Sequence, residues 1–378
     1  MALDLHEFGR KLTRYREQLK LLRTEVATST GIEEARIVEL ESGTNSPSGD
    51  EVLILADFYR CDYRFFISNE RLAPFEQTEN LYRRFGNEFS KEDRWRVQEF
   101  LFLCECEQFL MDSLDRKYAK FTFVPKGTYF KGHGESAAMS LRKHLGYEVS
   151  DVAGDVYRDF RKIGLHVFRR HLVNSNISGV MIRHPFAGPC VLVNYTEDIY
   201  RQRFTAAHEV AHAILDQQEF VVSFAKWGHN DLVEIRANTF ASRYLLPSQL
   251  LRSLPEKSWS RDSLIAWASR LKVSALALAI GLKESGILTE EEFSSLSSVK
   301  VPAHLKSDPE IEGIEGRSLK RKQSLMERGL STAYVSLCFD ALAGGIVTNA
   351  RAAEMLLASE DELNEMARLF QVNLFAHD

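Results

Sequence analysis

The sequence has 378 residues, of which 44% are hydrophobic and 27% are charged, and its formal net charge is −5. This length predicts two or three domains, and the composition is ordinary for a soluble globular protein. The acidic balance argues against nonspecific nucleic-acid binding by the whole chain, although it allows a local basic patch. The N-terminus has no apolar core of a secretory signal, no stretch approaches the ~18 apolar residues of a membrane helix, and the five cysteines are scattered. We therefore expect a cytoplasmic protein without a membrane partner.

Two helical segments are predicted at the start of the chain. Residues 1–67 predict a domain of short helices, because Phe8 and Leu12 recur at helical spacing and Gly31 marks a turn. Residues 68–124 predict a helical connector with one or two longer helices. This connector is also a candidate dimerisation element.

Residues 125–290 predict a mixed unit with both strands and helices. Val, Ile and Phe are dense in three short runs that Asn, Ser, Gly and Pro separate, a pattern typical of strands. The three runs are residues 165–168, 177–182 and 190–193. Two helices follow, and Pro247 ends the second of them.

Residues 291–378 predict a helical C-terminal region, with a charged loop near residues 306–323. The pattern does not decide among a ligand sensor, a lid and a partner surface. The whole chain is therefore predicted to be α+β, with all-α regions on both sides of a mixed core.

The helix after the third run contains H-E-x-x-H, formed by His208, Glu209 and His212. Histidines at i and i+4 lie one turn apart on one helical face, so both imidazoles can bind one Zn²⁺. The intervening glutamate can accept a proton from a metal-activated water. Small and apolar neighbours bury these polar groups, which is costly unless they bind a metal or one another. The motif predicts a zinc-dependent hydrolytic site, against the alternative of a chance match in a core helix.

A third protein ligand must come from elsewhere in the chain. Glu234 leads a helical stripe of small and apolar residues, which indicates a buried carboxylate that binds the metal. The alternatives are that Glu234 only favours the helix dipole, or that His229 is the ligand. Asn238, one turn after Glu234, could hydrogen-bond a ligand histidine. The other downstream candidates are Asp216, Glu219 and Asp231.

Two segments together resemble the ImmA/IrrE family of metallopeptidases. They are R-F-T-A-A-H-E-V-A-H at residues 203–212 and E-x-x-A-N-x-F-A-x-x-x-L-L-P at residues 234–247. The similarity extends over roughly residues 136–288. The resemblance implies a zincin-like core, with a small mixed sheet packed on the active-site helix, and a gluzincin-like arrangement of ligands.

The same resemblance implies roles for four residues. His208, His212 and Glu234 would bind zinc, and Glu209 would be the general base. Family members commonly cleave repressors or antitoxins, so the resemblance also implies a part in stress, phage or mobile-element control.

The N-terminal domain resembles the Xre/Cro-type helix-turn-helix over residues 5–67. The matching segments include E-V-A at 25–27, G-I at 31–32 and I-V-E-L-E-S-G at 37–43. In such domains the helix at about 33–40 would enter the major groove of DNA. The candidate DNA contacts are Arg10, Lys11, Arg14 and Arg36.

The charges of this domain argue against tight DNA binding. Residues 1–60 contain eight basic and eleven acidic side chains. Glu33, Glu34 and Glu39 stand against the single Arg36 on the expected recognition helix, and they would repel phosphates. DNA binding and a protein-docking or dimerisation role both stay open.

The sequence thus supports two hypotheses. The first is a zinc endopeptidase with a helix-turn-helix domain, cleaving a specific regulatory protein such as a repressor or antitoxin encoded next to it. The alternative is a DNA-binding transcriptional regulator or antitoxin in which the metallopeptidase fold is a non-catalytic scaffold or partner-binding module. Retention of His208, Glu209, His212 and Glu234 favours the enzyme. A homodimer is compatible with either hypothesis.

Overall fold

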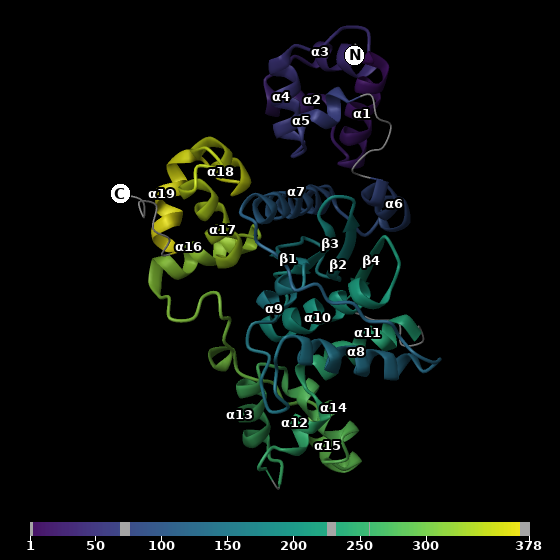
Figure 1. Ribbon diagram of the computed structural model, residues 1–378, viewed down its shortest axis with the longest axis vertical. Coiled ribbons are helices and arrows are strands. Elements are labelled where there is room, and N and C mark those ends of the chain that lie inside the picture. The colour runs from purple at the N-terminus through teal and green to yellow at the C-terminus, as the bar shows by residue number, and fades with distance from the viewer. Residues whose placement is uncertain (1–2, 69–75, 225–231, 257, 371–378) are drawn as a thin grey trace. The chain divides into compact units, whose positions relative to one another are not determined.

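The computed structural model describes residues 3–68, 76–224, 232–256 and 258–370 (Figure 1). The chain divides into two compact units. The first comprises Met1–Cys106, Leu172–Asn174 and His184–Phe186, and the second comprises Glu107–His171, Ser175–Arg183 and Ala187–Asp378.

Within residues 3–68, five short helices form the predicted N-terminal domain. They are α1 Leu5–Gln18, α2 Arg23–Thr30, α3 Glu34–Ser42, α4 Gly49–Phe58 and α5 Tyr63–Ile67. Asp4 and Ser48 begin α1 and α4 by accepting hydrogen bonds from backbone N–H groups of the first turn. Gly31 ends α2 with a φ of 72°, which strains any residue with a Cβ and redirects the chain toward α3. The core includes Phe8, Leu12, Val26, Ile37, Leu40 and Leu55.

The predicted connector is helical and contains α6 Glu76–Phe85 and α7 Lys91–Ser113. Inside the first unit, Trp95 of α7 lies against Phe58, with 5.3 Å between the ring centroids. The start of α7 therefore belongs to the same packed unit as the N-terminal helices.

The second unit contains a sheet whose described strands have the order β1-β3-β2-β4. The strands are β1 His166–Arg170, β2 Ile177–His184, β3 Gly188–Asn194 and β4 Phe220–Phe224. β1 runs parallel to β3, whereas β4 runs antiparallel to β2, so the sheet is mixed as predicted. The sequence analysis missed β4, a short edge strand.

Four helices form the layers next to this sheet (Figure 1). They are α8 Phe130–His144, α9 Val156–Lys162, α10 Ile199–Leu215 and α11 Leu232–Leu245. α9 and α10 contact the strands of the sheet directly. α10 packs on β3, and α11 packs on both α10 and α8. A Cβ at Gly134 of α8 would overlap the backbone oxygen of Arg236 on α11, so this close helix approach requires a glycine.

Further helices follow the core: α12 Ser248–Arg252, α13 Arg261–Leu271, α14 Ala275–Glu284 and α15 Glu290–Leu296. No single helix in the described ranges is long and apolar enough to cross a membrane, and only α13 and α14, bent by 100°, pass that test as a pair.

The C-terminal region is helical, as predicted. It contains η1 Ala303–Leu305, α16 Gly316–Glu327, α17 Thr332–Ala343, α18 Asn349–Met355 and α19 Glu360–Leu369. The predicted charged loop at 306–323 is wrong in its last part, because α16 begins at Gly316. Lys322, Leu325 and Met326 share the buried face of α16, and that shared face stabilises a helix despite the basic run.

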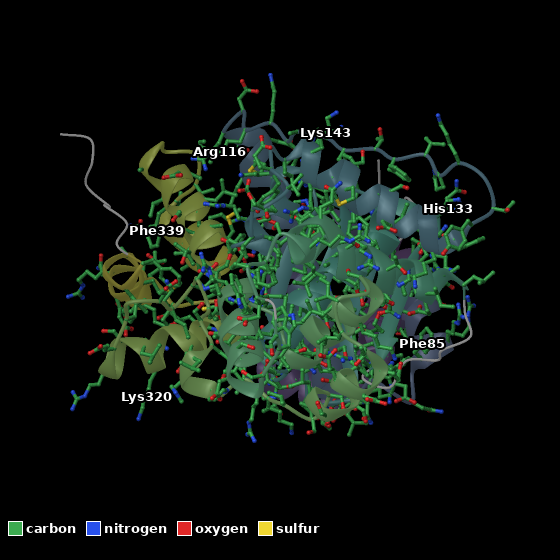
Figure 2. All side chains as sticks on the ribbon, turned by 90° about the horizontal axis from the view of Figure 1, so that it is seen from below. Phe85, Arg116, His133, Lys143, Lys320 and Phe339 are labelled. Atoms are coloured by element: carbon green, nitrogen blue, oxygen red, sulfur yellow. The ribbon has the colours of Figure 1, made fainter. Side chains whose placement is uncertain are left out.

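Hydrogen bonds join the C-terminal region to the edge of the sheet. His171, directly after β1, donates its backbone N–H to the carbonyl of Glu327 at 3.0 Å. The guanidinium of Arg169 donates twice to the Asp308 carboxylate, at 2.7 and 3.1 Å. Asp340 of α17 accepts a hydrogen bond from Arg116 at 2.5 Å. Arg116 and Phe339, the residue before Asp340, are labelled in Figure 2. This region is therefore part of the second unit.

Candidate metal centre

Helix α10 carries the H-E-x-x-H motif through the interior of the second unit. Asp198 begins the helix by accepting a hydrogen bond from a backbone N–H of the first turn. Small side chains on α10 permit close packing against the sheet and α11. As a result, His208, Glu209 and His212 have no exposed surface.

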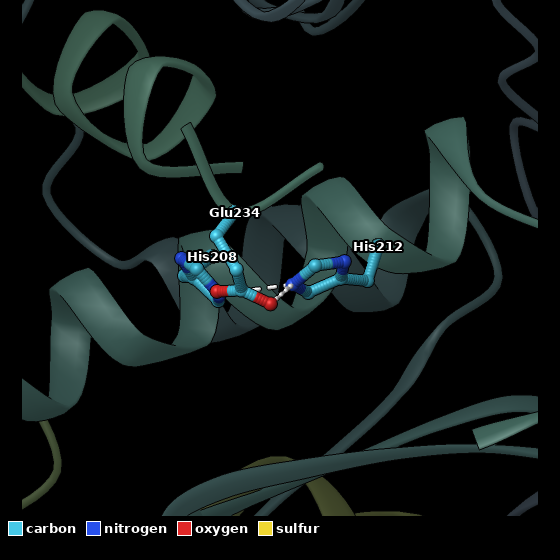
Figure 3. Close-up of side chains that lie close together, drawn as sticks. All are labelled: His208, His212 and Glu234. Carbon is cyan, nitrogen blue, oxygen red and sulfur yellow. Dashed lines mark hydrogen bonds and ion pairs between the residues drawn. The ribbon is translucent and has the colours of Figure 1, made fainter. Parts of the chain in front are cut away.

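Three potential ligand groups converge on one point (Figure 3). The Nε2 atoms of His208 and His212 lie 2.9 Å apart. The Glu234 carboxylate reaches from α11, with 3.3 Å from Oε2 to Nε2 of His208 and 3.6 Å from Oε1 to Nε2 of His212. Two nitrogens bound tetrahedrally to zinc at ~2.0–2.1 Å stand about 3.3 Å apart. The three groups therefore need only a small outward adjustment to hold the ion.

The hydrogen bonds behind the histidines also fit a metal. Nδ1 of His208 lies 3.2 Å from Oδ1 of Asn238, and Nδ1 of His212 lies 2.6 Å from Oδ2 of Asp216. An oxygen acceptor at each Nδ1 favours the tautomer with its proton there. Both Nε2 lone pairs then face each other and the Glu234 carboxylate. This arrangement is repulsive alone, and a divalent cation at the shared point relieves it.

The two histidines differ in their electrostatic surroundings. Burial, and next the nearby His212, lower the pKa of His208 well below its ordinary value. Burial also lowers the pKa of His212, but the hydrogen bond with Asp216 and the charges of Glu209 and Glu234 outweigh it and raise the pKa overall. The difference follows from the carboxylates near His212, of which Asp216 at Nδ1 has the largest effect.

Glu209 is a buried carboxylate, and the side chain of Ser223 on β4 is its nearest polar influence besides the charged groups of the cluster. Burial is the main cause that raises its pKa to about 8. Gly179 of β2 provides the space for this side chain, because a Cβ there would lie 2.8 Å from Oε1 of Glu209. A carboxylate with a pKa near neutrality can both accept and return a proton.

Glu234 provides the exposed side of the cluster. Its side chain is 23% exposed, whereas both histidine side chains are fully covered. Among the three ligand groups, the Glu234 carboxylate on α11 is therefore the one with contact to solvent.

The other sequence candidates have different positions. Asp216 points at Nδ1 of His212, so it lies behind the ring rather than at the shared point. Glu219 is exposed ahead of β4. His229 and Asp231 lie outside the described residues. The sequence analysis missed Gly179 and the contact of Asp216 with His212, although the i+4 spacing of Asp216 from His212 was a usable signal.

One candidate DNA contact, Lys11, has polar partners inside the domain. Lys11 is only 3% exposed, and its ammonium donates to the carbonyls of Phe65 and Ser68, at 2.6 Å each. The amine therefore holds α5 against α1 and is directed away from any phosphate.

The remaining candidate DNA contacts have acidic partners within the first unit. Arg36 donates to both oxygens of Glu51, at 2.7 and 3.0 Å, and to Glu39 at 2.9 Å. Arg10 pairs with Glu7 and Arg14 pairs with Glu79. A phosphate would have to compete with these carboxylates for each guanidinium.

The fold and the cluster define a class of protein: a peptidase-type domain with a buried H-E-x-x-H helix, joined to a helix-turn-helix domain. Comparison with known families agrees. Residues 160–283 match the family of IrrE N-terminal-like peptidase domains, and residues 7–63 match a helix-turn-helix domain. The chain therefore carries an IrrE N-terminal-like domain fused to an N-terminal helix-turn-helix, as the resemblance in the sequence implies. No curated protein matches the chain.

Proposed function

We propose that this protein is a zinc-dependent endopeptidase that cleaves one regulatory protein, a repressor or an antitoxin. The observation that carries the proposal is the convergence of His208, His212 and Glu234 beside the buried Glu209. These residues supply three protein ligands and a proton acceptor, and they leave one side open, as a catalytic zinc site requires.

The side chains divide the work of peptide hydrolysis. His208, His212 and Glu234 would hold a zinc ion, which would supply Lewis acidity for the activation of water and of a scissile carbonyl. Glu209 accepts the proton of the attacking water and returns it to the leaving amine. Its burial raises its pKa to about 8, and this value suits it for both transfers near neutral pH. Asn238 keeps the ring of His208 oriented.

We infer that the enzyme selects its substrate by contacts outside the metal centre. The cluster is buried except at Glu234, so an unrelated folded protein has little access to it. Binding energy from a remote contact would position one scissile bond, and short peptides without that contact would lose rate as well as affinity. The protein should therefore be a poor general protease.

The test uses the zinc-loaded full-length chain with the products of adjacent genes, with casein and with unrelated peptides. Cleavage should be confined to one partner, and Glu209→Gln should abolish it, whereas Glu219→Gln, an exposed control, should retain it. Casein degraded as fast as the best candidate would contradict the specificity. Absence of cleavage under every condition would favour the alternative of a non-catalytic scaffold.

A further inference from the structure

A chain of polar contacts links the metal centre to the helix that supplies its third ligand. Asp216 accepts a hydrogen bond from Nδ1 of His212 through Oδ2, at 2.6 Å. Its other oxygen, Oδ1, accepts from the Nη2 of Arg236. Arg236 lies on α11, two residues after Glu234. One carboxylate therefore connects a histidine of α10 to the helix that carries the glutamate.

Asp216 and Arg236 form a buried ion pair, and each of them makes a further contact. The side chains of Asp216 and Arg236 are 6% and 10% exposed, so solvent screens their attraction weakly. Arg183 donates to the backbone carbonyl of Asp216 at 2.6 Å and fixes the end of α10. The guanidinium of Arg236 also lies over the ring of Phe130, 5.0 Å from its centroid. Neither group can move far without losing a second contact.

We propose that Asp216 and Arg236 form a positioning clamp, which sets the orientation of His212 and the approach of Glu234 to the metal. The clamp rests on the metal site of the proposed function and adds two residues that do not touch the metal. Asn238 of α11 performs the matching task for His208, at 3.2 Å from its Nδ1. α11 thus contributes one ligand, Glu234. It also orients both histidines, because Asn238 contacts His208 directly and Arg236 contacts His212 through Asp216.

Loss of Asp216 or of Arg236 should weaken metal binding, because each of these two residues depends on the other for its orientation. Without Asp216, the ring of His212 loses its fixed tautomer and α11 loses a tie to α10. Without Arg236, the buried carboxylate of Asp216 loses its cation and no longer has one fixed orientation. Removal of such supporting contacts typically lowers metal affinity about 10- to 100-fold. Because the two residues act through one contact, their effects should not add.

The experiment measures zinc affinity of the full-length chain by competition with a chromophoric chelator. Asp216→Ala and Arg236→Met should each weaken binding about 10- to 100-fold, and the double variant should be no worse than Asp216→Ala. Asp216→Asn, which keeps an acceptor for His212, should recover part of the loss. The visible spectrum of the Co²⁺-substituted chain reports ligand geometry and should change in Arg236→Met.

The matched control is Arg243→Met. Arg243 lies on the same helix with a side chain 8% exposed, and it pairs with Glu284 at 2.9 Å without a contact to either histidine. Its variant should lower the melting temperature of the metal-free chain about as much as Arg236→Met, yet leave zinc affinity unchanged. This pairing separates positioning from a general loss of stability.

The outcomes distinguish the clamp from the proposed function. Tight zinc binding in the wild type, with equal affinity in Arg236→Met and Arg243→Met, would overturn the clamp and leave the metal site intact. A wild-type chain that binds no zinc would overturn both. If Arg236→Met does not fold, Arg236→Lys keeps the charge without the planar guanidinium, and an unchanged zinc affinity in that variant would equally contradict the clamp.

Discussion

The helix-turn-helix domain and the peptidase-type domain use their charged residues in opposite ways. In the peptidase-type domain, His208, His212 and Glu234 direct their acceptor atoms at one point, and their partners lie behind them. In the helix-turn-helix domain, cations are neutralised directly, as when Arg36 donates to both oxygens of Glu51. The two domains thus differ in whether the fold directs the polar atoms of a motif at one common point or pairs them with opposite charges.

Among the tests of this comparison between the two domains, the largest expected effect is the loss of cleavage rate on substitution of Gly179. In Gly179→Ala, the new Cβ would displace the Glu209 carboxylate, and a shift of about 1 Å can cost roughly 100-fold in rate. Zinc content should stay unchanged because the atoms nearest the new Cβ belong to Glu209 and Thr205, which are not proposed ligands. Gly154→Ala is the control, since its Cβ would meet nothing within 4 Å. Full cleavage activity in Gly179→Ala would show that the position of Glu209 does not limit the reaction.

A smaller effect concerns DNA. Glu33 and Glu34 are exposed at the start of α3, where a recognition helix meets the major groove. Replacing both with lysine removes two repulsive charges and adds two attractive ones, so nonspecific affinity at low salt should rise about tenfold and depend more steeply on salt. Fluorescence anisotropy with unrelated duplexes measures this. Lost binding to a specific site would instead mean that these acids read bases.

The smallest effect concerns the pairing of Arg36. Its guanidinium lowers the pKa of Glu51 to about 2. A depressed carboxyl pKa stabilises the folded state above the ordinary pKa near 4.5, and this contribution is lost as the pH falls toward 2. Carbon-13 NMR of the Glu51 carboxyl should show the low pKa, and Arg36→Gln should raise it toward the ordinary value, although the hydrogen bonds from Ser48 continue to lower it. An ordinary pKa in the wild type would mean that Arg36 is available to phosphate.

The sequence predicted much of the fold because periodicity is local. Apolar spacing identified the N-terminal helices and the first three strands, and H-E-x-x-H placed two histidines on one face of α10. It failed at β4, a five-residue strand whose pairing with β2 is a tertiary contact. It also failed at α16, where a basic run conceals an apolar face.

Prediction of the site was limited in the same way. The distance between Glu234 and the histidines depends on how α11 packs across α10. The spacing of apolar residues along one helix does not predict that packing. The burial of Lys11 depends on carbonyls more than fifty residues away in the sequence. A count of basic residues therefore overstates the charge available to DNA.

Zinc content of the purified full-length chain tests the central claim most directly. Elemental analysis should find a single zinc ion per chain in the wild type, in Glu209→Gln and in Glu219→Ala, and should find it lost in Glu234→Ala, because Glu234 is the one of these three glutamates that we propose as a ligand. A fully metal-loaded Glu234→Ala protein would contradict the assignment of Glu234 and transfer the role of third ligand to another residue, with His229 as the first to test.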